Sequence, residues 1–494
     1  MSTAHTSTGR APGSHVVVIG GGISGLAAAH RLLDGGARVT VLEASGRLGG
    51  KLLAGEIAGV PVDLGAESML ARRPEAVELA RATGLGDRLQ PPTTATAALW
   101  TRGALRPMPK GHVMGVPGDL DLLASSGVIS PEGMARIAED EALERTEVGA
   151  DVAVGEYVAA RLGREVVDRL VEPLLGGVYA GDAYRISMRA AVPQLFEAAR
   201  AERSLIEGVR GIQARTAARA AEPGRAQAPV FMGIAGGVGT LPVAVADAVR
   251  AAGGEIRTHT PVRELRRTAG GWRVVLDGGE GPAALDADAV VLATPASAAA
   301  RLLAAEAPAA ATELSAVEYA SMALMTMAFR RAEVEAALSG SGFLVPPVDG
   351  RGIKASTFAS NKWGWIADAD PDLFVLRTSV GRYHDEADLA RDDADLVELS
   401  LRDLGEAVGL AARPVAQRVT RWNDGLPQYP VGHLERVARI RAEAGKLPGL
   451  RVCGALYDGV GIPACIASAR TAADDILDTL PQAATAGARE WTHD

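Results

Sequence analysis

Cysteine is nearly absent from this chain, since only Cys453 and Cys465 occur in 494 residues. So few thiols argue against a disulfide framework and favour a reducing compartment, and we expect both side chains to be small buried apolar groups. The eight histidines show no His-x-x-x-His spacing, and there is no Cys-x-x-Cys pair. No metal site is therefore predicted.

The sequence also lacks an excess of positive charge and a long apolar run. Its net charge is -9 with a pI near 5.6, so neither nucleic acid nor an anionic membrane is indicated as a partner. The most apolar long segment, residues 296–311, carries Arg301 and Glu306 and predicts a helix of a soluble protein. Residues 1–14 lack the apolar centre of an export signal and predict a disordered tail. We expect a cytoplasmic protein without membrane association.

The clearest positive feature is the segment VVVIGGGISGLAAAHRLL at residues 16–33, which predicts a buried strand, a tight turn and a helix. Gly20, Gly22 and Gly25 have G-x-G-x-x-G spacing. The first glycine permits the turn, the second lets backbone N–H groups approach a pyrophosphate, and the third lets the helix pack against the strand. This spacing alone is also compatible with an ordinary glycine-rich turn.

The following residues favour a dinucleotide. RVTVL at residues 38–42 predicts a second strand that ends at Glu43, about 20 residues beyond the glycines, where a carboxylate accepts hydrogen bonds from ribose hydroxyls. The next segment, ASGRLGGK, adds a cation and a glycine pair. It resembles the R-x-G-G segment of the flavin-dependent amine oxidase superfamily, which holds the phosphates of FAD. By that resemblance, Gly65, Ala66, Glu67 and Ser68 form the next flavin contact.

The remainder of the chain alternates between two patterns. Helical periods dominate residues 120–169, and residues 197–228 are compatible with either a solvated helix or a loose linker. A strand, a glycine turn and a helix are predicted over residues 231–248, where the glycines do not match the phosphate fingerprint and are expected to serve a tight turn. Further strands are predicted at residues 97–109, 254–265, 272–277, 287–295, 323–329, 342–346 and 373–380, and further helices at 74–83 and 394–408.

Near the C-terminus, residues 450–469 predict a strand that leads through Gly459 and Gly461 to a helix that Pro463 can start. Four segments then resemble one family: PMPKGHVMGVP, LVEPLLGGVYAGD, RWNDGLPQYPVGH and YDGVGIPACI. These are similar to segments of the oxygen-dependent porphyrinogen oxidases of haem synthesis, most closely the soluble bacterial form that oxidises coproporphyrinogen III. The resemblance covers residues 15–477.

That resemblance implies an α/β fold with three parts. They are an FAD-binding Rossmann-like domain of the flavin amine oxidase and p-hydroxybenzoate hydroxylase type, an antiparallel α+β substrate-binding domain and an α-helical insertion. The expected boundaries are FAD-binding residues 1–90, 211–300 and 429–480, substrate-domain residues 91–109 and 301–428, a helical insertion at 110–210 and a tail at 481–494.

The resemblance also assigns site residues. Arg73 matches a basic residue that meets a substrate propionate, and the helix after Gly461 directs its positive end at the flavin. The chain departs from the family at Ala66-Glu67, often Pro-Asp, and at Ser379, often tyrosine. The positions that fall on FAD contacts are Gly20, Gly22, Ile23, Ser24, Gly25, Glu43, Ala44, Arg47, Gly50, Lys51, Gly65, Ala66, Glu67, Ser68, Val262, Trp422, Val460, Gly461 and Ile462.

The implied reaction removes six electrons from coproporphyrinogen III in three two-electron flavin cycles, with O2 as acceptor and H2O2 as by-product. Pyrrole protons can pass to water, so no catalytic side chain is named. More substrate carboxylates require more cations at the substrate site, and the candidates are Lys110, Lys354, Lys362, Arg102 and Arg106.

Other interpretations remain open. A protoporphyrinogen IX oxidase shares the same motifs, whereas a flavin amine oxidase or carotenoid desaturase lacks LVEPLLGGVYAGD. A flavin-free binding protein of the same fold is disfavoured by the intact glycines and Glu43. Contact with a ferrochelatase that uses the product would fit the proposed pathway, but neither this contact nor the oligomeric state leaves a trace in the sequence.

Overall fold

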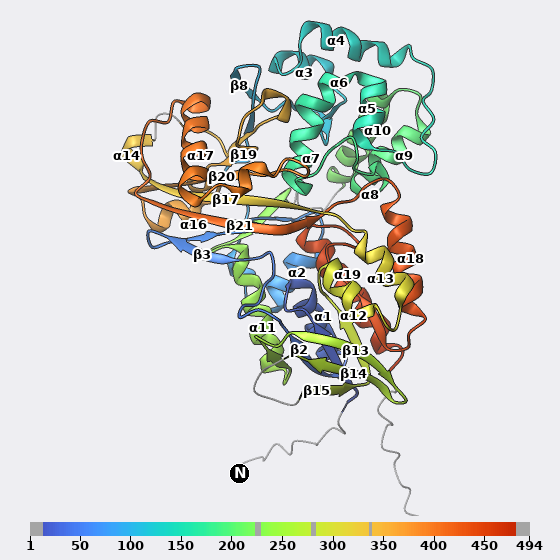
Figure 1. Ribbon diagram of the computed structural model, residues 1–494. Coiled ribbons are helices and arrows are strands. Elements are labelled where there is room, and N and C mark those ends of the chain that lie inside the picture. The colour runs from blue at the N-terminus through green and yellow to red at the C-terminus, as the bar shows by residue number, and fades with distance from the viewer. Residues whose placement is uncertain (1–12, 223–228, 278–282, 335–337, 481–494) are drawn as a thin grey trace, which may run out of the picture.

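The computed structural model describes residues 13–222, 229–277, 283–334 and 338–480. Figure 1 shows three regions: a parallel sheet with its helices at the bottom, a large second sheet at the upper left and a group of helices at the top. The expected tail at residues 481–494 lies outside the described residues, as do residues 1–12.

The parallel sheet is assembled from distant parts of the chain. Its five strands run in the order β12-β2-β1-β16-β22, and every neighbouring pair is parallel. Such a sheet is covered on both faces, which explains the runs of valine in its strands. The bounds are β1 (His15–Ile19), β2 (Arg38–Leu42), β12 (Glu255–Arg257), β16 (Ala289–Leu292) and β22 (Leu450–Val452).

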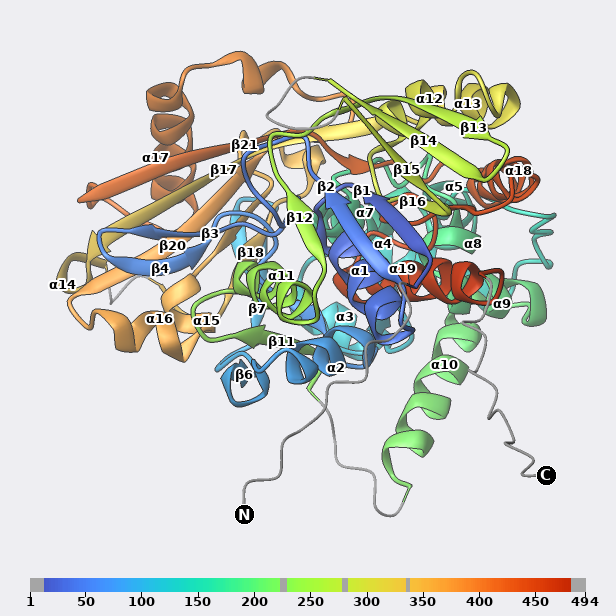
Figure 2. The ribbon, with the colours of Figure 1, turned by 90° about the horizontal axis from the view of Figure 1, so that it is seen from below.

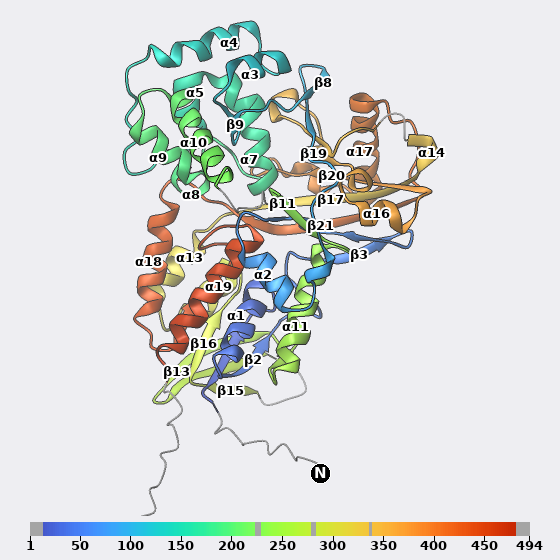
Figure 3. The same ribbon diagram turned by 180° about the vertical axis from the view of Figure 1, so that it is seen from behind.

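Alternate residues of β1 enter two different cores. Val16 and Val18 pack in a cluster with α1 (Ile23–Asp34), α2 (Glu75–Ala82), α11 (Leu241–Ala251) and α19 (Ile462–Leu477). Figure 3 shows α19 beside α1 on this face. Val17 and Ile19 pack on the other face in a cluster with strands β13 (Val262–Thr268), β14 (Gly271–Leu276) and β15 (Ala284–Ala287) and helices α12 (Ala296–Leu303), α13 (Pro308–Ser315) and α18 (His433–Gly445).

The second sheet has seven strands in the order β21-β17-β20-β19-β18-β7-β8. All neighbours are antiparallel except β18 and β7, which are parallel. One face packs on α17 (Asp393–Val408), where the Thr378 hydroxyl donates to Ser400 at 2.8 Å. The strands are β7 (Ala97–Thr101), β8 (Ala104–Pro107), β17 (Tyr319–Arg330), β18 (Gly342–Leu344), β19 (Ala355–Thr357), β20 (Leu373–Val380) and β21 (Ala416–Pro427).

The opposite face of this sheet contacts the hairpin of β3 (Ala54–Ile57) and β4 (Val60–Asp63), through a cluster that joins Val62 to Val375. The short helices beside it are α14 (Arg331–Val334), α15 (Ala359–Lys362) and α16 (Gly364–Ala369). Three smaller strands, β5 (Met69–Leu70), β6 (Leu89–Gln90) and β11 (Phe231–Ile234), form a separate sheet, and β9 (His112–Val113) pairs with β10 (Val116–Pro117).

The helical region has a core of its own, and it rests against the edge of the seven-stranded sheet, where Leu99 and Leu344 join that core. Its helices are α3 (Leu120–Ser126), α4 (Pro131–Ala138), α5 (Val154–Leu162), α6 (Arg164–Val166), α7 (Glu172–Tyr179), α8 (Met188–Ala191), α9 (Pro193–Ala201) and α10 (Leu205–Ala220). A π-helical stretch at Val167–Val171 joins α6 to α7. Figure 2 shows α10 extending away from the body.

The structure corrects one local prediction and decides another that the sequence left open. The helix predicted over residues 296–311 is two helices, because Pro308, which has no N–H to donate, occupies the first turn of a new helix. The tract at residues 197–228 is helical in α9 and α10, and its part at 223–228 lies outside the described residues. No helix in the described ranges is long and apolar enough to cross a bilayer.

Candidate functional site

Both glycine segments of the predicted dinucleotide site meet at the carboxyl edge of the parallel sheet. Gly20 has φ +109°, and a Cβ on Gly25 would lie 1.8 Å from the Gly20 carbonyl oxygen. Gly22 precedes α1 without a side-chain cap and pairs with Gly49 as an isolated bridge. The first turn of α1, including Ile23 and Ser24, therefore offers N–H groups and the positive end of the helix dipole to an anion.

Glu43 follows β2 at the same edge. Its Oε2 accepts a hydrogen bond from the N–H of Gly21 at 2.8 Å, and its Oε1 accepts from the N–H and hydroxyl of Ser45. These bonds fix the carboxylate beside the glycine turn and leave lone pairs for further donors. The Thr294 hydroxyl is buried without a partner among the described residues, and its methyl group lies 3.5 Å from where a Cβ on Gly20 would stand.

The predicted cations lie beside an aromatic ring. Arg47 donates to the Gly50 carbonyl at 2.8 Å, and its guanidinium carbon is 5.6 Å from the ring centroid of Trp422. Lys51 Nζ is 5.7 Å from the same ring, and burial, with a contribution from Arg47, lowers its pKa. Ala44 between these groups and Glu43 is exposed. The two positive charges and the ring thus form one side of the glycine cradle.

Residues of the second sheet hold the loop at residues 65–68 in place. Trp422 Nε1 donates to the Leu64 carbonyl at 3.0 Å, and Arg377 donates to the carbonyls of Asp63 and Gly65 at 3.0 and 2.9 Å. A Cβ on Gly65 would lie 2.2 Å from the Lys51 carbonyl oxygen. Sequence reasoning missed Arg377, which lies on β20 more than 300 residues from the loop it holds.

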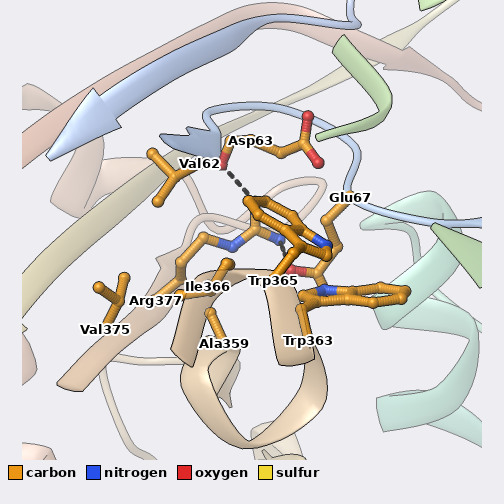
Figure 4. Close-up of a pocket in the computed structure, with 9 residues that line it drawn as sticks. All are labelled: Val62, Asp63, Glu67, Ala359, Trp363, Trp365, Ile366, Val375 and Arg377. Atoms are coloured by element: carbon orange, nitrogen blue, oxygen red, sulfur yellow. Dashed lines mark hydrogen bonds and ion pairs between the residues drawn. The ribbon is translucent and has the colours of Figure 1, made fainter. Parts of the chain in front are cut away.

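Glu67 is the charged group at the centre of this support (Figure 4). Its carboxylate pairs with Arg377 Nη2 at 2.9 Å and with Lys362 Nζ at 2.5 Å. Burial alone would raise the pKa of Glu67, but the two cations lower it to about 2. The Glu67 side chain is thereby held by these two cations, so Glu67 has only its backbone left for a ligand. Lys362, a candidate for a substrate carboxylate, is paired instead.

Asp63 ties a third segment to this loop. It accepts hydrogen bonds from the N–H groups of Val238 and Gly239 at 2.9 and 2.8 Å, and burial raises its pKa to about 7. Gly237, with φ +97°, makes the turn that presents those N–H groups. The glycines near residue 237 therefore serve a tight turn, as predicted, and their donors are directed at Asp63.

The C-terminal segment supplies a second helix N-terminus at the same edge of the parallel sheet. Gly461 precedes α19 without a side-chain cap, and Ile462 begins the helix. Val460 packs against the core of the helical region. Val262, at the start of β13, is buried among the strands behind the sheet. Arg73 pairs with Glu75 at 2.8 Å. Burial raises the pKa of the Cys465 thiol to about 11, and the charge of Arg73 opposes this rise only weakly.

A row of residues on the second sheet lies on the same face as Arg377. Cross-strand partners share a face, and the pairing aligns Thr420, Leu324, Ser379, Ala355 and Leu344 from β21 to β18. Met322 and Trp422 form the next pair along the strands. Within this row, Ser379 and Ala355 have small side chains and lie between Leu324 and Leu344.

Helix α7 approaches one end of this row. Leu344 and Val460 pack on the same core, and the atom nearest to a Cβ on Gly177 would be a Leu344 methyl at 3.9 Å. No atom lies within 4 Å of a Cβ on Gly176, and Val178 is 44% exposed. The glycine pair of LVEPLLGGVYAGD thus leaves open space beside α7, next to Leu344 of the second sheet.

The arrangement fits FAD. Two uncapped helix N-termini, a glycine cradle, a fixed carboxylate and an unpartnered buried hydroxyl lie at one edge of a parallel sheet, where such sheets bind dinucleotides. Cys453 and Cys465 are buried free thiols, as predicted. The described residues contain no group of three or more potential metal ligands.

Comparisons with known proteins agree with this fold. The family described as flavin containing amine oxidoreductase matches residues 23–477. Coproporphyrinogen III oxidase of Bacillus subtilis (strain 168) is 33% identical over 476 residues, covering 94% of this chain and 98% of the relative. The enzyme of the same name from Mycobacterium tuberculosis (strain H37Rv) is 37% identical over 467 residues, covering 94% and 97%.

Solved structures show the same architecture. A putative protoporphyrinogen oxidase from Exiguobacterium sp. 255-15 is 33% identical, with a TM-score of 0.83, and the match covers 95% of this chain and 99% of that one. Cyclohexylamine oxidase from Brevibacterium oxydans, 20% identical with a TM-score of 0.68 over 94% of this chain and 99% of that one, shares the fold. The protein is thus an FAD-dependent oxidoreductase that belongs to the flavin containing amine oxidoreductase family.

Proposed function

We propose that this oxidoreductase converts coproporphyrinogen III to coproporphyrin III. The observation that carries the proposal is the pair of relatives with that activity in their names, which align with 94% of the chain. Helix α7, from the porphyrinogen-oxidase segment LVEPLLGGVYAGD, supports it by leaving open space beside its glycine pair, next to Leu344 of the second sheet. The overall reaction removes six hydrogens and reduces three O2 to three H2O2, so atoms and electrons balance.

The proposed FAD contacts are the residues assigned from the sequence. The first turn of α1 would hold the pyrophosphate, Glu43 a ribose, and residues 65–68 and 460–462 the flavin ring. Bound FAD would accept two electrons at a time from a methylene bridge of the substrate and pass them to O2.

The protein's own residues position the reactants rather than exchange protons. The N-terminus of α19 offers partial positive charge where negative charge develops on reduction. Arg377 and Lys362 fix the loop at residue 67, and the apolar row from Leu324 to Leu344 would present a dry, flat wall to the macrocycle. We assign no catalytic acid or base, because pyrrole protons can leave to water. Arg73 is assigned to a substrate propionate.

Protoporphyrinogen oxidation is the second candidate, favoured by the name of the Exiguobacterium structure and by a chloroplastic protoporphyrinogen oxidase of rice at 28% identity. The test compares turnover of the purified enzyme on both porphyrinogens under air. A higher kcat/KM for the tetracarboxylate is expected. A clear preference for the dicarboxylate would replace the first proposal with the second.

We also propose that the enzyme works in the cytoplasm and releases its product to a ferrochelatase. Two buried free thiols suit a reducing compartment. Fractionation of cells at moderate salt would test the location, and recovery of most of the activity with membranes would contradict it.

A further inference from the structure

Two buried cations near α7 have no acidic partner among the residues that the structure describes. Lys354 and Arg382 are each 8% exposed, and neither makes an ion pair within the described ranges. Lys354 Nζ donates to the Gly381 carbonyl at 2.9 Å and lies 3.9 Å from Met322 Sδ. Arg382 Nη2 donates to the Val345 carbonyl at 2.8 Å, and its Nε and Nη1 have no hydrogen bond to described residues.

Burying these two cations without an anion destabilises the folded protein. Burial and the charge of Arg382 together lower the pKa of Lys354 to about 7, and burial also lowers the pKa of Arg382. The acidic groups whose charge acts on Arg382 are Asp385 and Glu172, and neither forms an ion pair with it in the described structure. Glu172 instead accepts the N–H of Ala183 at 2.6 Å, and burial raises its pKa to about 7. Uncompensated buried charges destabilise a fold, so their presence suggests a charged ligand.

The pair borders the sheet face described above. Met322, which contacts Lys354 Nζ, belongs to the pair with Trp422 on that face, next to Leu324 and Ser379. The segment that carries Arg382 is joined to the helical region, because the N–H of Tyr383 donates to the carbonyl of Ala180 at 2.7 Å. The two cations therefore lie where the sheet meets the C-terminal end of α7.

The other cations suggested by the sequence are placed differently. Lys362 is paired with Glu67, and Arg102 with Glu165 at 3.1 Å. Lys110 is exposed, and half-buried Arg106 donates to the Thr101 carbonyl. Of these five candidates, Lys354 alone combines deep burial with the lack of an acidic partner in the described structure.

We propose that Lys354 and Arg382 form a carboxylate-binding subsite that receives one propionate of the porphyrinogen. The inference rests on the proposed function, because the carboxylate belongs to that substrate. Lys354 would contribute a point charge through its remaining N–H groups, and Arg382 would donate through Nε and Nη1. A propionate bound there makes charge-assisted hydrogen bonds that an apolar substituent cannot make.

Binding of stable porphyrins tests the subsite apart from turnover. Coproporphyrin III, with four carboxylates, and mesoporphyrin IX, with two, are titrated by fluorescence against the FAD-loaded wild type, Lys354→Met and Arg382→Gln. Lys446→Met is the matched control, since Lys446, the residue after α18, is 67% exposed and pairs only with Glu443 in the described structure. Lys354→Met is expected to weaken coproporphyrin binding roughly 10–100-fold, and Lys354→Arg to restore most of it.

The outcomes separate a subsite from a structural role. If only coproporphyrin loses affinity, Lys354 and Arg382 bind a propionate that mesoporphyrin IX lacks. If both porphyrins lose affinity equally, the two cations bind a propionate that both porphyrins carry. Unchanged Kd values in both Lys354→Met and Arg382→Gln overturn the proposal. If Lys354→Met does not fold, an unchanged Kd in Arg382→Gln overturns it. The thermal midpoint of Lys354→Met should not fall, whereas a purely structural lysine would lower it. If the wild type binds coproporphyrin but does not oxidise coproporphyrinogen, the proposed function fails and the subsite stands.

Discussion

Replacing Gly25 with alanine should detach FAD from a protein that still folds. A Cβ at this position would lie 1.8 Å from the Gly20 carbonyl oxygen and 3.3 Å from the Ala293 Cβ. The first contact is with backbone, which cannot rotate away, so α1 must move by roughly 1 Å or more relative to β1. Such overpacking costs on the order of 1–3 kcal/mol of stability.

The effect on FAD follows from hydrogen-bond geometry. A movement of that size takes N–H groups at the first turn of α1 out of bonding distance of a pyrophosphate, because these bonds weaken beyond about 3.2 Å. We expect the Kd of FAD to rise at least tenfold, on the order of one or two lost bonds to a charged group.

The assay is titration of the apoprotein with FAD, followed by quenching of flavin fluorescence, with thermal unfolding in parallel. Gly445→Ala is the matched control, since no atom lies within 4 Å of its Cβ and the residue ends α18. The control should keep the wild-type Kd and gain up to about 0.5–1 kcal/mol of stability. A Gly25→Ala protein with an unchanged Kd would refute the reasoning.

Three further changes test other parts of the structure. Arg377→Gln leaves buried Glu67 with one cation, so the free energy of unfolding in urea should fall by about 3 kcal/mol, and a loss under 1 kcal/mol would contradict the role given to this pair. The stability of the wild type relative to Lys354→Met should rise as pH increases from 7 to about 10, because the unfolded lysine keeps a proton that the folded one, with a pKa of about 7, has lost; a pH-independent difference in urea would show that Lys354 is not desolvated. Gly177→Leu would fill space beside Leu344, so KM for the porphyrinogen should rise at least tenfold with FAD binding intact, and an unchanged KM would place the substrate elsewhere.

The local elements of the FAD-binding region were predictable from the sequence. Glycine spacing after Val16–Ile19 and the strand before Glu43 have short-range physical causes, and the structure confirms the strand, turn and helix. The break at Pro308 was not predicted, because the alanine-rich composition of residues 296–311 favours a single helix. Pro308 instead begins a second helix.

The supports of the site could not be predicted in the same way. Glu67 meets Arg377 and Lys362 because β4, β20 and α15 are brought together by the seven-stranded sheet, and no local pattern reports such distant pairing. Lys354 was a candidate cation only because lysine is rare in this chain. Arg382 could not be singled out from the sequence, because it differs from the many other arginines in being buried, and burial depends on the tertiary structure.

The central claim is tested most directly by the stoichiometry of the reaction. The purified, FAD-loaded enzyme is given coproporphyrinogen III in air, and porphyrin formation, O2 uptake and H2O2 release are measured together. The account predicts three O2 consumed and three H2O2 released for each coproporphyrin III, at a higher kcat/KM than with protoporphyrinogen IX. No porphyrin formation by an enzyme that is fully loaded with FAD would contradict it.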